Sequence, residues 1–237
     1  RPINQMDRDR EVVTALNEIV AVELRWGFWK CYDRLRDLGK PWNHKRIHRV
    51  YCQMGLNQKR RAKKRLPTRE RHSLIVVPIV NAVWALDFMF DSLYSGRSIR
   101  TLNVLDEANR GALGIDIATS IPASRVIRFV AQLIEIHGKP AAIRCDNGPE
   151  YISGALLTWA EQHDIRIDHI QPGKPQQNAY VERYNRTVRY GWLARTLFDT
   201  IEQVQDKATR WLWTYNHERP NMALGGITPI QKLALAA

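Results

Sequence analysis

The sequence lacks long hydrophobic runs, low-complexity tracts, internal repeats and any pattern of closely spaced cysteines. No apolar segment approaches the roughly 20 residues that a membrane-spanning helix needs, and no signal peptide opens the chain. Its three cysteines, Cys31, Cys52 and Cys145, are odd in number and widely spaced, which argues against a disulfide framework and for a reducing compartment. The 237 residues therefore predict a globular protein with one good-sized core and a small appended domain. Because the chain begins with Arg1 rather than Met, we expect a fragment or a processed product.

The positive charge is concentrated near the N-terminus. The chain carries a net charge of +12, and residues 1–72 hold 19 Lys and Arg against 8 Asp and Glu. Residues 73–237 hold 17 against 16, so they are close to neutral. A merely solubilising charge would be spread over both parts. A basic module beside a near-neutral domain instead predicts a polyanionic partner, most simply nucleic acid.

Residues 1–56 predict a basic helical domain of the helix-turn-helix type. Apolar residues recur at helical spacing over 8–38, and the pattern stops at Gly39. A second helix starts after the Gly-Lys-Pro-Trp turn, with Asn43 as its N-cap, and ends near residue 55. We expect this second helix to be a DNA-recognition helix that presents three basic side chains outward, those of Lys45, Arg46 and Arg49.

A basic linker follows at residues 57–77. It is rich in positive charge and has little to bury, so we expect an extended segment. Beside a helix-turn-helix, its side chains predict contacts with backbone phosphates. The basic residues concerned are Lys59, Arg60, Arg61, Lys63, Lys64 and Arg65.

From residue 74 the pattern changes to strands, and residues 78–200 predict a separate α/β core. Strands in series at 81–90, 98–106 and 111–119 indicate an antiparallel meander. Helices and strands then alternate, and the predicted elements are a helix at 122–138, a strand at 141–145, a helix at 153–164, a strand at 165–170, a long helix from Pro175 to about Leu197 and a last helix near 200–216. We expect residues 201–237 to pack on the core, which this order predicts to be a mixed sheet covered by helices.

Asp87 is a lone charge inside the apolar run N-A-V-W-A-L-D-F-M-F. The alternation of a strand places Trp84 and Leu86 on one face and Ala85 and Asp87 on the other. Burying an uncompensated carboxylate costs several kcal/mol or shifts its pKa until it is neutral. Asp87 therefore needs a cation, a place at the mouth of a cleft, or an ion pair with an arginine, which is the purely structural alternative.

Two further acidic residues have simple explanations when each is taken alone. Asp146 opens the segment D-N-G-P-E-Y after a strand, where a turn aspartate can bond its own backbone. Glu182 lies on the long helix, where a surface ion pair with Arg186 would account for it. If the fold brings both residues to Asp87, the three carboxylates make an oxygen-ligand site of the kind that Mg²⁺ prefers.

These acidic residues lie in motifs that match a known family. Residues 78–237 resemble the catalytic core shared by retroviral integrases and the OrfB-type transposases of bacterial insertion sequences. The likeness rests on W-A-L-D-F, D-N-G-P-E-Y and K-P-Q-Q-N-A-Y-V-E-R-Y-N, with 35 residues between Asp146 and Glu182. The tail Y-N-H-E-R-P-N-M-A-L-G-G-I-T-P is similar to the end of the insertion-sequence proteins, and residues 26–56 resemble their helix-turn-helix.

The resemblance implies a ribonuclease-H-like fold, an α/β architecture in which helices flank a mixed five-stranded sheet. It also implies that Asp87, Asp146 and Glu182 are the catalytic metal ligands for two Mg²⁺ ions, with Mn²⁺ able to substitute. Arg186 and Arg189 match the basic positions after the family's glutamate that approach the DNA end, and Asn147, Gly148 and Glu150 belong to the motif around the second aspartate. We expect Lys174 to contact DNA as well and Asn178 to support the motif.

The N-terminal part departs from retroviral integrases, which carry a His-His-Cys-Cys zinc site. Here His44, His48 and Cys52 follow one another on one predicted helix, with Cys31 upstream and no Cys-x-x-Cys pair. If these residues bound zinc, two of the spacings between the ligands along the chain would be unusual for a zinc site. We therefore expect histidines on a helix surface near DNA rather than a zinc site.

The activity implied by the resemblance is that of a DNA transposase, a metal-dependent polynucleotidyl transferase. Such a protein binds terminal inverted repeats and then cleaves and joins DNA strands. Its expected partners are transposon-end DNA, target DNA and further copies of itself, as a homodimer or higher multimer in the bacterial cytoplasm beside the nucleoid. Two alternatives stay open, a ribonuclease-H-like nuclease without strand transfer and an inert DNA-binding regulator derived from a transposase.

Overall fold

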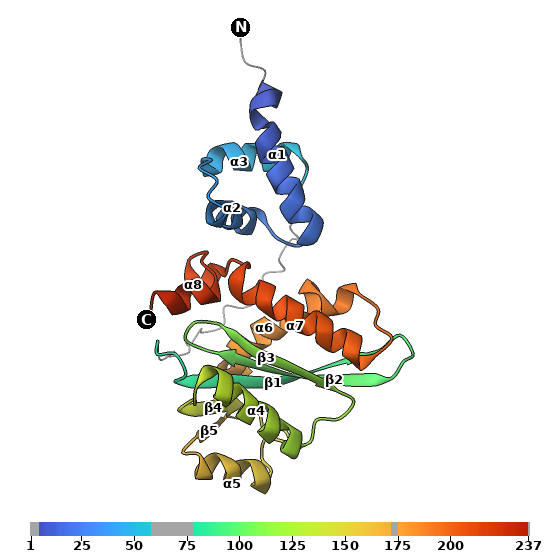
Figure 1. Ribbon diagram of the computed structural model, residues 1–237, viewed down its shortest axis with the longest axis vertical. Helices are drawn as coiled ribbons and strands as arrows, with labels where there is room; N and C mark the ends of the chain where they lie inside the picture. Colours follow the sequence, from blue (N-terminus) through green and yellow to red (C-terminus); the bar gives the residue numbers. More distant parts are fainter. Residues whose placement is uncertain (1–4, 58–77, 172–174, 237) are drawn as a thin grey trace, which may run out of the picture. The chain divides into compact units, whose positions relative to one another are not determined.

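The computed structural model describes residues 5–57, 78–171 and 175–236, and the chain divides into two compact units (Figure 1). One unit contains the three N-terminal helices and Glu218–Thr228, and the other contains the sheet with the remaining helices. The six basic linker residues and Lys174 lie outside the described residues. Among the helices that are described, none has the length and apolar character needed to cross a membrane.

The N-terminal unit consists of α1 (Gln5–Val22), α2 (Phe28–Asp37) and α3 (His44–Gln53). The helical stretch predicted over 8–38 is two helices, because the chain becomes extended at Gly27, the N-cap of α2 (φ −81°, ψ 169°). Gly39 ends α2 with a φ of 73°, a conformation that favours glycine. Asn43 caps α3 as predicted, and its side chain accepts a hydrogen bond from the Lys45 N–H at 2.8 Å. The two helices and the turn therefore form the predicted helix-turn-helix.

The three helices bury one apolar face each against the others. Ile47, Val50 and Tyr51 of α3, which were predicted to point inward, are only 0–2% exposed. They share one cluster with Leu16 of α1 and Leu35 of α2. Each such side chain contributes about 1.5–3 kcal/mol on burial, so this unit has a core of its own.

The second unit is built on a mixed five-stranded sheet. Its strands are β1 (Val83–Ser92), β2 (Ser98–Asp106), β3 (Ala112–Ala118), β4 (Ala142–Cys145) and β5 (Arg166–His169). Their order across the sheet is β3-β2-β1-β4-β5. The first three form the predicted antiparallel meander, whereas β4 runs parallel to β1 and β5 parallel to β4. Strand β1 is therefore central, as its apolar sequence predicted.

Helices cover both faces of this sheet (Figure 1). One face carries α4 (Ala123–His137) and α5 (Gly154–Gln162), and the other carries α6 (Ala179–Gly191) and α7 (Ile201–His217). The short helical segments are α8 (Pro229–Ala234) and the 3-10 turns Pro175–Asn178, Leu193–Arg195 and Met222–Leu224. Trp84 and Leu86 of β1 join the core beneath α4 and α5, while Ala85 and Met89 join the core beneath α6 and α7. The alternation places Asp87 on the α6 face.

The helix that carries Glu182 is shorter than the sequence predicts. Instead of one helix from residue 175 to about 197, a 3-10 turn leads into α6, which ends at Gly191. A Cβ atom at Gly191 would lie 3.3 Å from the Trp211 indole nitrogen, and Trp192 leaves helical geometry with a φ of −146°. The chain turns where α7 packs closely, a tertiary contact that the apolar periodicity of α6 does not report.

A buried ion pair ties β4 to the rest of the sheet. Glu107, which follows β2 and is 2% exposed, accepts hydrogen bonds through both carboxylate oxygens from Arg144 Nη1 of β4, each at 2.7 Å. The Glu107 N–H also donates to the carbonyl of Val83 at the start of β1. Burial raises the pKa of the Glu107 carboxyl, and the charge of Arg144 opposes that rise. The pair therefore holds together the ends of three strands.

We expect Arg144→Met to lower the free energy of unfolding by about 3–5 kcal/mol, because it leaves the Glu107 carboxylate buried without a partner. Urea unfolding followed by tryptophan fluorescence measures the loss. As a control, the double variant Glu107→Gln/Arg144→Met should recover much of it, since no uncompensated charge remains. A loss below about 1 kcal/mol in the single variant would show that the pair does not hold the strands.

Candidate active site

Asp87 lies in the middle of β1 with its carboxylate toward α6. Its Oδ1 accepts a hydrogen bond from the Phe88 N–H at 2.9 Å, and its Oδ2 accepts one from Asn185 Nδ2 at 2.8 Å. Burial raises the pKa of Asp87 to about 7, the charges of Asp146 and Glu182 add to the rise, and the two hydrogen bonds oppose it. In the described part of the chain no arginine pairs with this carboxylate, so the structural ion pair considered from the sequence is not formed there.

The register of β1 and β4 brings Asp146 to Asp87. Residues 83–85 pair in parallel with residues 142–144, Asp146 follows directly after β4, and its charge acts on Asp87. Asp146 Oδ1 also accepts a hydrogen bond from the Gly148 N–H at 2.8 Å. A Cβ atom at Gly148 would lie 3.0 Å from this oxygen, so the turn is tight. Asp146 is thus both a turn aspartate bonding its own backbone and a neighbour of Asp87.

Glu182 approaches the same place from the first turn of α6. Its side chain is exposed, and its charge contributes to the raised pKa of Asp87. The described residues give it no ion pair with Arg186, the surface pair considered from the sequence. The three carboxylates therefore share one electrostatic neighbourhood, although 35 residues separate the last two.

The three carboxylates suit a divalent cation by their chemistry, but they do not form a closed set of ligands. Among the residues that the structure describes, no three His, Cys, Asp or Glu side chains lie close enough together to hold one metal ion. The donors are nevertheless hard oxygen atoms, and each Asp87 oxygen accepts one hydrogen bond and keeps a lone pair for a cation. Closing the set requires side-chain movement, for which the exposed Glu182 is well placed.

The turn after Asp146 is held by contacts with β2 and with the end of β5. Asn147 Nδ2 donates to the Ile170 carbonyl, and Glu150 forms an ion pair with Arg100, whose guanidinium lies 4.2 Å from the centre of the Phe88 ring. Burial acts to raise the pKa of Glu150, but Arg100 outweighs it and the pKa is lowered. The side chains of Asn147 and Glu150 thus contact the surroundings of the turn, whereas Gly148 bonds Asp146 itself through its backbone N–H.

Two asparagines connect the α6 region to β1. Asn178, predicted to support the motif, is buried, and its Nδ2 lies 3.4 Å from the Leu86 carbonyl. Asn185 binds Asp87 directly and was not predicted as a site residue. The signal in the sequence was its place on the side of α6 that is otherwise apolar, where a buried amide needs a partner.

The two arginines that follow Glu182 on α6 have different surroundings. Arg186 is exposed. Arg189 donates through Nη2 to the Phe90 carbonyl at 2.8 Å and lies 3.7 Å from the Asp91 carboxylate. Arg186 therefore offers its charge to solvent, whereas Arg189 already binds β1.

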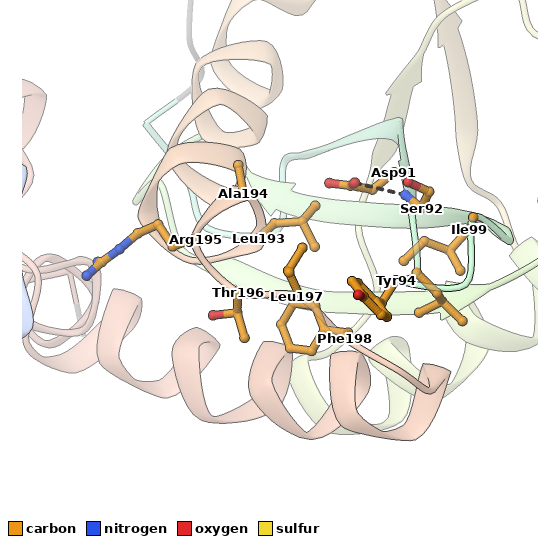
Figure 2. Close-up of a pocket in the computed structure, with 12 residues that line it drawn as sticks. Asp91, Ser92, Tyr94, Ile99, Leu193, Ala194, Arg195, Thr196, Leu197 and Phe198 are labelled. Carbon is orange, nitrogen blue, oxygen red and sulfur yellow. Dashed lines mark hydrogen bonds between the residues drawn. The ribbon is translucent and has the colours of Figure 1, made fainter.

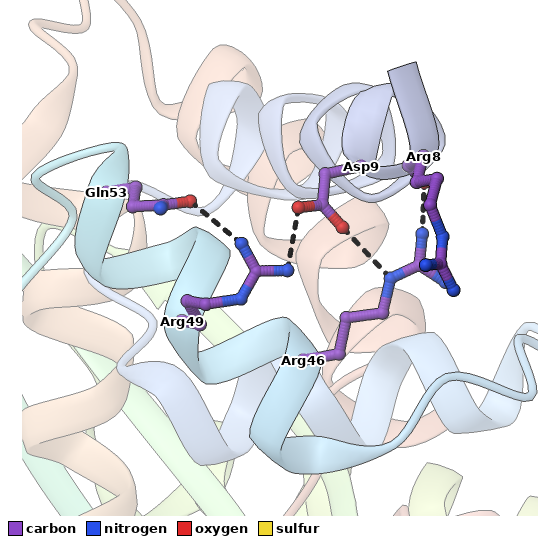
Figure 3. Close-up of polar contacts among 5 residues, drawn as sticks. All are labelled: Arg8, Asp9, Arg46, Arg49 and Gln53. Carbon is purple, nitrogen blue, oxygen red and sulfur yellow. Dashed lines mark hydrogen bonds and ion pairs between the residues drawn. The ribbon is translucent and has the colours of Figure 1, made fainter. Parts of the chain in front are cut away.

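In the N-terminal unit, two of the three predicted recognition residues bind an acid (Figure 3). Arg46 Nε lies 3.0 Å from Asp9 Oδ1, and Arg49 Nη2 lies 2.7 Å from Asp9 Oδ2. Burial acts to raise the pKa of Asp9, but the hydrogen bonds from both arginines outweigh it and the pKa is lowered. These arginines join α3 to α1 rather than pointing wholly outward, and Lys45 is the most exposed of the three.

A cavity of about 490 Å³ lies between the end of β1 and the chain after α6 (Figure 2). Its lining includes Asp91, Leu93, Tyr94, Leu193 and Phe198. None of the three carboxylates lines it. The candidate active site is therefore distinct from this cavity.

Without divalent metal, Asp87→Asn is expected to stabilise the protein at pH 8 but not near pH 4. The folded-state pKa of about 7 lies above the ordinary value of 3.8, so stability is lost as the carboxyl ionises between these pH values. Removing the charge should raise the free energy of unfolding by about 1–2 kcal/mol at pH 8. This gain is smaller than the whole pKa shift would correspond to, because the asparagine side chain keeps only one acceptor oxygen.

Thermal unfolding in EDTA at both pH values measures this gain. Asp91→Asn, on the same strand, is the matched control and should show no such pH-dependent gain. An equal gain in the control, or a gain for Asp87→Asn that persists near pH 4, would contradict the assignment of a raised pKa to Asp87.

Comparisons with known proteins match both units of the chain. Residues 7–65 match the HTH-like domain, and residues 78–175 and 163–229 match the integrase core domain. The 31.7 kDa protein of insertion element IS407 from Burkholderia multivorans is 34% identical over 224 residues, which cover 94% of this chain and 81% of that protein. The 39.2 kDa protein of insertion element IS476 from Xanthomonas euvesicatoria is 36% identical over 216 residues. This match covers 91% of this chain but only 62% of the IS476 protein.

Among solved structures, the HTLV-2 integrase catalytic core in complex with magnesium, in a dimeric form, has a similar fold. The TM-score is 0.51 at 20% identity, and the match covers 65% of this chain and 96% of that one. The sheet order β3-β2-β1-β4-β5 with helices on both faces is thus the ribonuclease-H-like fold that the resemblance implied. The chain belongs to the OrfB-type family of insertion-element transposases, which carry a helix-turn-helix domain before an integrase core.

Proposed function

We propose that this protein is a DNA transposase that binds the terminal inverted repeats of its element and cleaves and joins DNA strands at Asp87, Asp146 and Glu182. The observation that carries the proposal is that the charges of Asp146 and Glu182 both act on Asp87 within an integrase core. The helix-turn-helix adds a DNA-binding module, and the excess positive charge of residues 1–72 favours a nucleic-acid partner. The protein would act in the bacterial cytoplasm on nucleoid DNA.

The three carboxylates would hold two Mg²⁺ ions, which Mn²⁺ can replace. Their oxygen donors suit Mg²⁺, and the HTLV-2 integrase core that shares this fold is in complex with magnesium. When bound, such cations supply positive charge that lowers the barrier to attack on an anionic phosphodiester. Asp87 is carried by β1, and Asp146 follows directly after β4, the strand that pairs with β1, where the Gly148 N–H holds its side chain.

The attacking oxygen would come from outside the protein, from water for cleavage and from a DNA 3′-OH for joining. Both reactions are in-line displacements at phosphorus, so one site can perform both. The chain supplies the position of the carboxylates, through the β1–β4 register for Asp87 and Asp146 and through α6 for Glu182. Arg186, exposed on the same helix, would bind the phosphate backbone of the DNA end.

Two transposon ends must be processed together, so two active sites must be held together. We therefore propose that the protein works as a homodimer or higher multimer on transposon-end and target DNA. The dimeric form of the solved HTLV-2 core is in keeping with this arrangement.

A strand-transfer assay distinguishes this function from its alternatives. Incubated with a labelled terminal repeat, target DNA and Mg²⁺ or Mn²⁺, the protein is expected to produce joined strands. Cut but unjoined ends would indicate a plain nuclease, and bound but uncut DNA an inert regulator. Asp146→Asn should lower joining on the order of 100-fold or more, because it removes a ligand oxygen and a charge.

Asp168→Asn is the matched control for that variant. Asp168 lies on β5 and pairs with the exposed Arg166 of the same strand at 2.6 Å, and among the described residues it forms no hydrogen bond or ion pair with the three carboxylates. It should leave joining close to wild type. Undiminished joining by Asp146→Asn would rule out the assignment of the three carboxylates.

Lys45→Ala is expected to weaken binding of the terminal repeat without changing the melting temperature, because Lys45 is exposed on α3. The slope of log affinity against log salt should fall in magnitude by about 1 for one lost phosphate contact. Fluorescence anisotropy across a salt series measures both effects.

Arg49→Ala, which also loses the ion pair with Asp9, should lower the melting temperature as well. An unchanged salt slope in Lys45→Ala would exclude a phosphate contact by this residue.

A further inference from the structure

Behind Asp87, a chain of buried amide side chains links three elements of the fold. Asn103 lies on β2 directly opposite Asp87 in the β1–β2 ladder. Its Nδ2 donates to Asn185 Oδ1 on α6 at 2.7 Å, and Asn185 Nδ2 donates to Asp87 Oδ2 at 2.8 Å. Thr101 Oγ1, also on β2, accepts a second hydrogen bond from Asn103 Nδ2 at 3.3 Å. The hydrogen bonds therefore run in one direction, from β2 through α6 to the carboxylate.

These polar side chains are withdrawn from solvent. Thr101 and Asn103 are 0% exposed, and Asn185 is 8% exposed. The side-chain oxygen of Asn103, Oδ1, has no hydrogen-bond partner among the described residues. An unsatisfied buried oxygen disfavours the folded state, so stability alone does not explain an amide at this position of β2. A requirement at Asp87 does explain it.

The order of donors determines which way the Asn185 amide faces. Both hydrogens of Asn103 Nδ2 are in use, so the atom of Asn185 that faces it must be an acceptor. The amino group of Asn185 then faces Asp87, where an ionised carboxylate can only accept. Turning this amide over would set amino group against amino group and carbonyl against carboxylate, and both hydrogen bonds would be lost.

We propose that Asn103 and Asn185 are positioning residues for the cation site, a role that rests on the proposed function. Asn185 holds Asp87 Oδ2, and Asn103 holds Asn185 in the orientation that can donate. Asn185 lies three residues after Glu182, so the same contact sets α6, and with it Glu182, against the strand of Asp87. The amides thus reduce the rearrangement needed to bring the carboxylates onto one cation.

Metal binding by the full chain in the absence of DNA tests this role. Asn103→Leu and Asn185→Leu remove the amides but keep the same number of side-chain heavy atoms and the branch at Cγ. The probe is Mn²⁺ alone, with the free ion followed by its paramagnetic resonance signal. We expect each variant to bind Mn²⁺ about 10–100-fold more weakly, as is typical when a partner of a metal ligand is removed. The double variant should bind Mn²⁺ almost as well as whichever single variant binds it less tightly, because both residues act through one contact.

Asn216→Leu is the matched control. Asn216 joins α7 to β3 through two hydrogen bonds with the Ala112 backbone, at 2.9 and 2.8 Å, and does not contact the carboxylates. Its loss should lower the melting temperature but leave Mn²⁺ affinity unchanged. If Asn185→Leu disturbs folding, the variant Asn185→Ala, whose side chain is smaller, tests the same contact.

The Mg²⁺ dependence of strand cleavage gives a second measurement. Both asparagine variants should need more Mg²⁺ for half-maximal cleavage and approach the wild-type rate at saturation, which a merely destabilised fold would not do. Wild-type Mn²⁺ affinity in both variants, while Asp146→Asn loses it, would overturn the positioning role and leave the proposed function intact. A wild-type protein that binds no Mn²⁺ and joins no strands would overturn both.

Discussion

The burial of one carboxylate in a central strand is the constraint on which the rest of the core depends. Asp87 lies on the face of β1 that packs beneath α6, and burial raises its pKa to about 7. A fold selected for stability alone would place an arginine beside it or an apolar residue in its position. The chain instead adds Asp146 and Glu182, whose charges raise the pKa further. Such a local conflict is typical of a functional site, where stability is given up for chemistry.

Much of this arrangement follows from local patterns in the sequence. Alternation along β1 predicts which face Asp87 occupies, and Asn43 predicts the start of α3, because both signals act over a few residues. The likeness to integrase cores and transposases predicts the sheet and the nearness of Asp146 to Asp87. Glu182 taken alone was indistinguishable from a surface residue, and only the motif around it and its spacing from Asp146 singled it out.

What sequence patterns could not predict depends on side chains that meet across long stretches of chain. Asn103 and Asn185 are 82 residues apart, and each has an ordinary place in its own element. The outward direction predicted for Arg46 and Arg49 considered α3 alone, whereas Asp9 on α1 binds both. Helical periodicity assigns a face to a residue but not a partner, because the partner depends on how helices pack. An acid on a neighbouring helix can therefore change a recognition residue into one that also supports the fold.

Burial is the main cause of the raised pKa of Asp87, and repulsion by the charges of Asp146 and Glu182 adds to it. Carboxylates that approach one another repel, so without a cation the exposed Glu182 gains by keeping its distance. Asp87 cannot withdraw in the same way, because the strand fixes its backbone and Asn185 holds its oxygen. Repulsion therefore acts on one carboxylate that its surroundings hold in place and on one that is exposed on a helix. If these residues bind the cation as proposed, Asp87 is already oriented for it and Glu182 is the exposed side chain that can adjust.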